Sequence, residues 1–182
     1  GSNSPNDFRS FTADRVVVDE RDFCVETNLA LLEDRIAHSR VKIMRRISTP
    51  TTPDRRISAE YAASDSRKYL LRCEACGERQ DLEWEINAVE KTDDGQWILR
   101  DIAGRAVCRA CGKPIDRIGR GEWVPEFPGR GVAGFQISRL YSPTVTIPHL
   151  LEKWRLAQGD DTKVQVFFNS DLGRPYQAKG SR

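Results

Sequence analysis

Four cysteines are the residues whose type and spacing point most directly to chemistry. They lie in two matching C-x-x-C-G turns, "CEACG" at residues 73–77 and "CRACG" at residues 108–112. In each turn the glycine permits a positive φ, which lets backbone N–H groups face the thiolates. Two such turns complete the tetrahedral sulfur set of a zinc site. The predicted metal ligands are Cys73, Cys76, Cys108 and Cys111.

The paired turns favour a metal site over the alternative, a redox-active dithiol. A redox pair needs only one such turn, whereas this chain has a matching second one. Four thiolates leave no coordination position open, so we expect the zinc to be structural rather than catalytic. Cys24 stands outside the set and is predicted to be a buried thiol. His38 and His149 are predicted to be surface or capping residues.

An acid pair, Asp19 and Glu20, follows the β-branched run "RVVV" at residues 15–18. In a P-loop ATPase a strand ends with an Asp that holds the Mg²⁺ shell, and the next Glu orients and deprotonates the attacking water. Ser48 and Thr49 end the next strand candidate, where they could sense a γ-phosphate. Two simpler interpretations stay open. The acids could begin a helix, where they favour its dipole, and Ser48 and Thr49 could enter a turn.

A strand, a helix and a second strand would have to bring these four side chains together. "RVVVDE" at residues 15–20 predicts a buried parallel strand, and "VKIMRRIST" at residues 41–49 predicts another. A helix over residues 26–39 is predicted by the apolar spacing of Val25, Leu29, Leu32 and Ile36. Short joints between these elements imply a right-handed parallel crossover, so residues 14–50 are predicted to belong to an α/β sheet.

Between the cysteine pairs the sequence predicts a β-hairpin. Its strands would lie within residues 81–90 and 96–102, on either side of a tight reversal at Asp94-Gly95. Such a hairpin would bring the two cysteine turns together. Ahead of the first turn, Ser58 is predicted to cap a brief helix over residues 59–65.

The C-terminal third is predicted to hold one strand and two helices. The strand candidate is "VAGFQISRLY" at residues 132–141. A helix follows over residues 147–158, with Thr146 as its cap and Gly159 as its end. The last short helix lies within residues 161–176 and runs into a turn.

The composition, 38% hydrophobic and 31% charged over 182 residues, indicates a globular chain. A net charge of +2 gives almost no field for capturing an acidic polymer, so any DNA contact must come from a local patch. We expect either such a patch or a merely solvated surface at Arg105, Arg109, Lys113, Arg117, Arg120 and Arg130. No apolar run reaches the roughly 20 residues of a membrane span, and "GSNSPNDFRS" lacks signal-peptide features. A cytoplasmic location is therefore expected.

These segments occur together, in order, in a known family. The matching stretches are "GSNSP", "VVVDE", "ISTPT", "SDSRKYLLRCEACGERQDLEW", "CRACGKPI", "GEWVPE", "GRGVAGFQISRLYSP" and "FFNSDLGRPY". Over nearly its whole length the chain resembles the large subunit of lambda-type phage terminases, the DNA-packaging ATPase and nuclease. The resemblance implies a partial P-loop NTPase-type parallel sheet with an inserted four-cysteine zinc-ribbon hairpin.

The resemblance also implies roles for the acid pair. Asp19 corresponds to the Mg²⁺-holding acid, Glu20 to the catalytic glutamate, and Ser48-Thr49 to the coupling motif. Arg21 and Ile47 depart from the family's pattern. The cofactors implied are structural zinc and Mg-ATP. The partners implied are double-stranded DNA, the small terminase subunit, the portal and procapsid, and further copies of the subunit, all in the cytoplasm of the host cell.

The expected domain organisation is that of an interior piece of this motor. Residues 1–66 are assigned to the C-terminal part of the ATPase domain, residues 67–125 to the zinc ribbon, and residues 126–182 to elements that return to the ATPase domain and lead toward a nuclease domain absent from the chain. No G-x-x-x-x-G-K-[ST] loop is present, so the chain alone is not expected to hydrolyse ATP. The alternative function is a non-enzymatic zinc-ribbon adaptor that binds DNA or protein.

Overall fold

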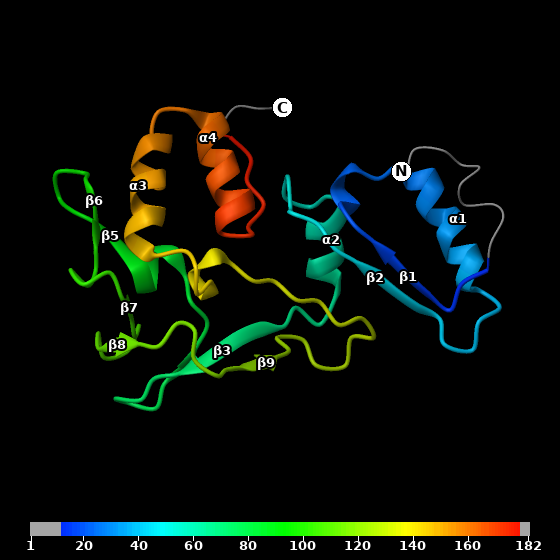
Figure 1. Ribbon diagram of the computed structural model, residues 1–182, viewed down its shortest axis with the longest axis horizontal. Helices are drawn as coiled ribbons and strands as arrows, with labels where there is room; N and C mark the ends of the chain where they lie inside the picture. The colour runs from blue at the N-terminus through cyan, green and yellow to red at the C-terminus, as the bar shows by residue number, and fades with distance from the viewer. Residues whose placement is uncertain (1–11, 179–182) are drawn as a thin grey trace.

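The N-terminal part of the chain folds as a two-stranded parallel sheet with one helix against it (Figure 1). The structure, a computed structural model, describes residues 12–178. Strand β1 (Arg15–Val18) pairs in parallel with β2 (Ile43–Arg46), and helix α1 (Glu26–Ile36) connects them. The predicted strand, helix and parallel strand are confirmed, although both strands are shorter than their apolar runs. Residues 12–178 hold no further strand of this sheet, so a P-loop-type sheet stays a prediction.

Alternation along β1 decides which face of this sheet is buried. Val16 and Val18 are buried, while Val17 between them is exposed. The α1 residues in the same small core are Leu29, Leu32 and Ile36. The register places Val18 opposite Arg46, so the segments that follow β1 and β2 leave the sheet at the same edge. The "GSNSP" stretch of the family resemblance lies outside the described residues.

Helix α2 (Arg56–Ala63) joins this unit to a three-stranded antiparallel sheet (Figure 1). In that sheet β3 (Lys68–Arg72) lies between β4 (Arg79–Gln80) and β9 (Glu122–Val124). The long strand β3 thus carries the chain from α2 to the first cysteine turn.

The start of α2 lies earlier than its sequence pattern indicates. Arg56 is its first residue, so Ser58, the predicted cap, lies inside the first turn. The N–H of Ile57 at this end donates to the carboxylate of Asp22, 3.0 Å away. A cap supplied by a distant segment leaves no local signature, and the prediction of Ser58 as the cap is therefore wrong.

The predicted hairpin between the cysteine pairs is confirmed. Strands β5 (Val89–Lys91) and β6 (Trp97–Leu99) pair antiparallel around Gly95, which has a φ of +85°. A single π-helical turn, η3 (Trp84–Ala88), precedes β5. The second cysteine turn is closed by the short pair β7 (Ala106–Val107) and β8 (Pro114–Ile115).

The strand predicted over residues 132–141 does not form. The segment makes one isolated bridge, between Phe135 and Arg67, and ends in a 3-10 turn, η4 (Arg139–Tyr141). The neighbouring strand β3 already pairs with β4 and β9, which leaves only its N-terminal flank for this segment. Its apolar residues Val132 and Ile137 are exposed, so their spacing does not reflect a buried strand face.

Two helices form the C-terminal part of the molecule, as predicted. Helix α3 (Ile147–Ala157) is capped by Thr146, whose Oγ1 accepts from the N–H of His149 at 3.3 Å. Helix α4 (Asp161–Val166) follows and continues into a π-helical turn, η5 (Phe167–Asp171). Each helix within residues 12–178 is too short or too polar to span a bilayer.

The main hydrophobic core lies between the cysteine-bearing hairpins and these helices. Trp154 of α3 meets Trp97 and Phe167 at ring-centroid distances of 5.8 and 5.0 Å, and Phe167 meets Trp84 at 5.3 Å. Leu150 and Trp84 are almost fully buried in the same cluster. The ribbon and the C-terminal helices therefore share one core.

Candidate functional site

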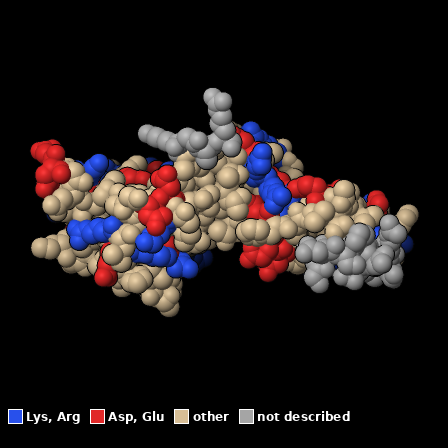
Figure 2. Space-filling view, turned by 90° about the horizontal axis from the view of Figure 1, so that it is seen from above, with Lys and Arg blue, Asp and Glu red and all other residues tan. Residues whose placement is uncertain are grey.

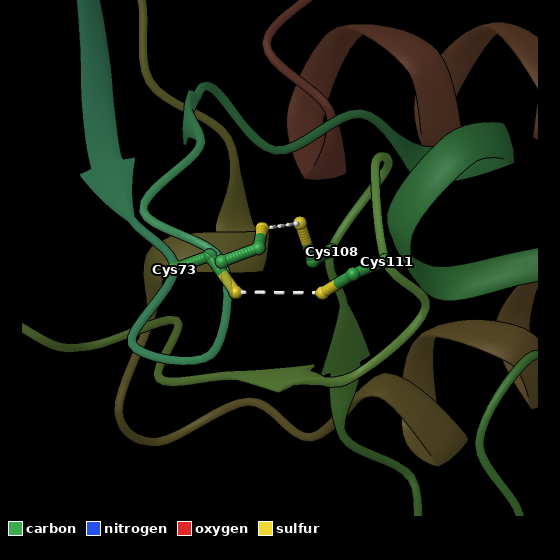
Figure 3. A group of neighbouring side chains, drawn as sticks. Cys73, Cys108 and Cys111 are labelled. Atoms are coloured by element: carbon green, nitrogen blue, oxygen red, sulfur yellow. Dashed lines mark hydrogen bonds between the residues drawn. The ribbon is translucent and has the colours of Figure 1, made fainter.

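The four predicted metal ligands lie together (Figure 3). Their sulfur atoms are all within 4.8 Å of one another, and none forms a disulfide. The Cys73 and Cys111 sulfurs are 3.8 Å apart, and those of Cys76 and Cys108 are 3.7 Å apart. A tetrahedron with Zn–S bonds of about 2.3 Å has sulfur–sulfur edges of about 3.8 Å. The spacing of the sulfurs therefore fits a tetrahedral metal ion.

The two cysteine turns have the same backbone hydrogen bonds. In both, the N–H of the first cysteine donates to the carbonyl oxygen five residues later, at 2.8 Å. The glycine N–H then donates back to the carbonyl oxygen of that cysteine, at 2.8 Å for Gly77 and 2.9 Å for Gly112. Both glycines have a positive φ, +80° and +67°, which a residue with a Cβ rarely adopts. Each C-x-x-C-G sequence thus specifies its own turn locally.

Two buried amides support one of these sulfurs. Gln80 Nε2 donates to the Cys108 sulfur at 2.9 Å, while Gln80 Oε1 accepts from Asn87 Nδ2 at 2.8 Å and from the N–H of Arg109 at 2.9 Å. Asn87 also donates to the Val107 carbonyl oxygen at 2.8 Å. Both amide side chains are almost fully buried. Nothing in the local sequence marks Gln80, because the sulfur that it supports lies 28 residues away.

The sulfur environment stabilises negative charge unequally. Burial alone would raise the pKa of the Cys108 thiol, but backbone N–H groups of Cys111 and Ala110 and the Gln80 amide outweigh it and lower the pKa to about 6. The backbone N–H of Glu78 lowers the pKa of Cys76, yet hydrogen bonds with the neighbouring thiols, together with burial, raise it to about 12. Four thiolates this close repel one another, and a divalent cation at their centre would remove that repulsion.

The acid pair lies on an exposed turn directly after β1. Glu20 has a left-handed backbone (φ 52°, ψ 46°), and its N–H donates to Asp19 Oδ1 at 2.9 Å. The N–H of the next residue, Arg21, donates to the Ile47 carbonyl oxygen at 3.0 Å. The short 3-10 turn η2 (Arg21–Phe23) follows, and no Glu20 side-chain bond caps it. Neither acid lies within helix α1, which begins at Glu26.

Ser48 lies beside the acid-pair turn, as its place after β2 predicts. Its hydroxyl oxygen accepts from the N–H of Asp22 at 3.0 Å, and the hydroxyl donates to the Thr49 carbonyl oxygen at 3.2 Å. Thr49 itself is exposed. The predicted buried thiol, Cys24, lies beneath the same turn, with its sulfur 3.7 and 3.6 Å from the carbonyl oxygens of Asp19 and Glu20.

Two buried charged residues hold this turn and were not among the predicted site residues. Asp22 is 1% exposed, and Arg21 is 5% exposed. Arg21 forms ion pairs of 2.9 Å with Glu26 and 2.8 Å with Glu60. Burial lowers the pKa of Arg21, but hydrogen bonds to these two carboxylates outweigh it and raise the pKa above its usual value. Arg21 stands where the family more often has an apolar residue, and its buried charge is paired with the carboxylates of Glu26 and Glu60.

Two family models match the chain. The model of the phage terminase large subunit gpA ATPase domain covers residues 1–125, and the model of the gpA endonuclease domain covers residues 132–182. The chain belongs to the phage terminase large subunit gpA family. Membership of a terminase family implies DNA as a partner. No curated protein and no solved structure matches the chain.

The two family matches test the resemblance found in the sequence and can be compared with the predicted domain boundaries. The lambda-type terminase resemblance is confirmed. The endonuclease-domain match begins at residue 132, within the segment that the sequence assigned to a return to the ATPase domain. The gpA ATPase match includes both the acid-pair turn and the four cysteines.

The basic residues predicted as a DNA patch are largely bound within this terminase chain itself. Arg105 pairs with Asp101 at 2.6 Å, and Arg109 pairs with Asp81 at 2.7 Å. Figure 2 shows basic and acidic side chains interspersed on the face it displays, without one continuous basic surface.

The other two bound arginines of this set donate to carbonyl oxygens. Arg130 donates to that of Ala62 at 2.6 Å and that of Ser64 at 2.9 Å. The Arg117 guanidinium donates to the carbonyl oxygens of Leu140, Ser142 and Val145, at 2.6 to 2.9 Å. Burial lowers the pKa of Arg117. Within the described residues, the side chains of Lys113 and Arg120 are exposed and form no ion pair or hydrogen bond.

Proposed function

We propose that the acid-pair turn is part of the ATP site of a DNA-packaging motor. The observation that carries the proposal is the pair of exposed carboxylates, Asp19 and Glu20, at the edge where the parallel strands β1 and β2 both end. In α/β sheets, ligands bind in the crevice outside the carboxyl ends of the strands. Residues 1–125 match the gpA ATPase domain, so Mg-ATP is the ligand class we assign to this edge.

The two acids would take different roles. Asp19 lies first after the strand and would hold the Mg²⁺ shell, which supplies charge stabilisation to the transferred phosphoryl group when bound. Glu20 would orient the attacking water and accept its proton. Ser48, bound to the N–H of Asp22, would report the phosphate state to the segment after β2. Thr49 is exposed beside it and is assigned to the same coupling segment.

We assign zinc to the four cysteines, in a structural role. A closed set of four sulfurs leaves no position for substrate. Two of the sulfurs belong to cysteines that are 0% and 2% exposed, Cys73 and Cys108, and both residues are part of the main core. The metal would thus hold the hairpins in the shape against which α3 and α4 pack.

The proposed biological role follows from the family. In the complete large subunit, ATP hydrolysis would drive double-stranded DNA into procapsids, and the endonuclease domain would cut it. The proposed partners are the small terminase subunit, the portal and procapsid, and further copies of the large subunit in the host-cell cytoplasm. The zinc-ribbon adaptor is not favoured, because both family matches are to enzyme domains.

The test is Mg²⁺-dependent ATP hydrolysis by the complete large subunit. Glu20→Gln should lower kcat by at least about 100-fold while nucleotide binding persists, because a general base contributes that much to catalysis. Glu33→Gln, an exposed change on α1, is the matched control and should leave turnover unchanged. Residues 1–182 alone should show no turnover. An unchanged kcat in Glu20→Gln would remove the acid pair from the mechanism.

A further inference from the structure

Asp22 is a buried carboxylate two residues after the proposed general base. Its Oδ2 accepts from the N–H of Thr51 at 2.9 Å and from the Thr51 hydroxyl at 2.7 Å, and its Oδ1 accepts from the N–H of Ile57 at 3.0 Å. No Lys or Arg within residues 12–178 forms an ion pair with it. A buried charge held only by neutral donors is sensitive to the position of those donors. Asp22 therefore fixes the distance between its own turn and residues 51–57.

The same turn is bound to the segment after β2 along its backbone. The N–H of Arg21 donates to the Ile47 carbonyl oxygen at 3.0 Å, and the N–H of Asp22 donates to Ser48 Oγ at 3.0 Å. With the Asp22 carboxylate on Thr51, three consecutive attachments join the two segments. A shift of the acid-pair turn has to move the segment from Ile47 to Thr51 or break these bonds.

Thr51 also contacts the C-terminal part of the chain. Its carbonyl oxygen accepts from the N–H of Tyr176 at 3.1 Å. The Tyr176 ring stacks on Phe168, with centroids 5.0 Å apart and planes 15° apart, and the Tyr176 carbonyl oxygen accepts from Gln165 at 3.4 Å. In Figure 1 the cyan segment after β2 faces the red C-terminal segment. Thr51 thus binds the acid-pair turn on one side and the endonuclease-matching segment on the other.

We propose that Asp22 and Thr51 form a latch that couples the acid-pair turn to the endonuclease-matching segment, with Asp22 as a positioning residue. A contiguous set of hydrogen bonds that passes through one short, buried side chain, that of Asp22, can transmit a small displacement. The coupling is reciprocal, so order at Tyr176 also favours the acid-pair geometry. The nucleotide-dependent part of this inference rests on the proposed ATP site, whereas the latch itself does not.

The latch is tested first by amide hydrogen exchange in the 182-residue chain. Asp22→Asn replaces a charged acceptor by an amide of the same shape and should speed exchange of the Tyr176 N–H by about tenfold, although Asp22 does not contact Tyr176. Asp101→Asn is the matched control, because Asp101 accepts backbone and arginine hydrogen bonds in a turn of the ribbon. Asp101→Asn should leave the exchange rate of the Tyr176 N–H unchanged.

A local role predicts a different result. If Asp22→Asn speeds exchange only at Thr51 and Ile57, with Tyr176 as in the parent, the latch is overturned and Asp22 is merely a helix cap. Exchange in α3, at Leu150, reports whether the variant is folded. If Asp22→Asn does not fold, Thr51→Val decides, because it removes one hydroxyl bond and keeps the backbone donor. It should speed Tyr176 exchange in the same direction by a smaller factor, and an unchanged rate overturns the latch.

The nucleotide arm uses the complete large subunit. A non-hydrolysable Mg-ATP analogue should change Tyr176 exchange in the parent and in Asp101→Asn. The change should be lost in Asp22→Asn, while the analogue's Kd stays within about threefold. Analogue binding without a Tyr176 response in the parent overturns the coupling. Failure of the parent to bind the analogue would overturn the proposed ATP site, and exchange in the 182-residue chain would still decide the latch.

Discussion

Gln80 donates a hydrogen bond to the sulfur of Cys108 at 2.9 Å while its amide oxygen is held by Asn87, so a buried side chain fixes the orientation of a predicted metal ligand. Hydrogen bonds of this kind orient a ligand and reduce repulsion between thiolates. Among residues 12–178, a buried amide side chain donates to the sulfur of Cys108 and to none of the other three. The predicted metal centre would therefore depend on a residue outside the C-x-x-C turns.

Replacing this amide should weaken metal binding without removing a ligand. Gln80→Glu keeps the shape and the acceptors for Asn87 and Arg109 but loses the N–H donor to sulfur. We expect zinc affinity to fall by about 10- to 100-fold, measured by competition with a chelator and with Co²⁺ absorption as a second readout. Gln96→Glu, in the exposed hairpin loop, is the control and should bind as the parent does. Equal affinities for the two variants would contradict the role of Gln80.

Removing one sulfur should remove the metal. Elemental analysis of the parent should give one zinc per chain, and Cys73→Ser should lose it and unfold at lower temperature, because three thiolates no longer close the tetrahedron. Cys24→Ser is the control, since Cys24 lies under the acid-pair turn and outside the sulfur cluster. Zinc retained at full stoichiometry in Cys73→Ser, or disulfides in the freshly purified parent, would sink the four-thiolate site.

The core shared by the ribbon and α3 should make them unfold together. Leu150 is fully buried in the main cluster, and Leu150→Ala should cost about 2–5 kcal/mol of unfolding free energy. Leu156, in the same helix, is 71% exposed, and Leu156→Ala should change stability by less than about 0.5 kcal/mol. Denaturant unfolding followed by Co²⁺ absorption and by far-UV circular dichroism should give one midpoint for each variant. Two separated midpoints would show that the ribbon folds independently.

Acid should loosen the junction between α2 and residues 126–134. Burial would raise the pKa of Asp65, but the Gly134 N–H and the Arg67 guanidinium, 3.0 and 2.8 Å from its carboxylate, outweigh it and hold that pKa below its usual range. Because the folded-state pKa lies below the unfolded value of about 3.9, Asp65 stabilises the fold above that pH. This contribution is lost as the pH falls through the folded-state pKa.

The measurement is the free energy of unfolding between about pH 6 and pH 3. Asp65→Asn should be less stable than the parent at the upper end and lose less stability on acidification. Asp93→Asn, on the exposed tip of the hairpin, should keep the parent's pH dependence. Parallel curves for the parent and Asp65→Asn would show that Asp65 does not carry the acid sensitivity.

The parts of the fold that could be predicted are those specified by residues close together in the sequence. A C-x-x-C-G turn is closed by hydrogen bonds within its own backbone, so the cysteine cluster could be predicted. The spacing of apolar residues along β1 and α1 determines which faces are buried, so the parallel strand pair could be predicted too. The roles of Asp22 and Gln80 could not be predicted, because their hydrogen-bond partners lie 29 and 28 residues away and no short sequence motif indicates them. The strand predicted over residues 132–141 does not form, because an apolar pattern becomes a strand only where a neighbouring strand has a free edge to pair with.

DNA contact, if it occurs on the ribbon, should depend on the cations that the fold leaves free. Arg105, Arg109, Arg117 and Arg130 are engaged by carboxylates or carbonyl oxygens, whereas Lys113 and Arg120 are exposed near the second cysteine turn. Each phosphate contact contributes close to one unit to the dependence of log K on log salt. Changing both Lys113 and Arg120 to Ala should therefore reduce that slope by about two in the complete large subunit. Arg105→Ala, which removes an arginine already paired with Asp101, should change it by less than half a unit, roughly. A larger effect from Arg105 than from the Lys113 and Arg120 pair would place the phosphate contacts elsewhere.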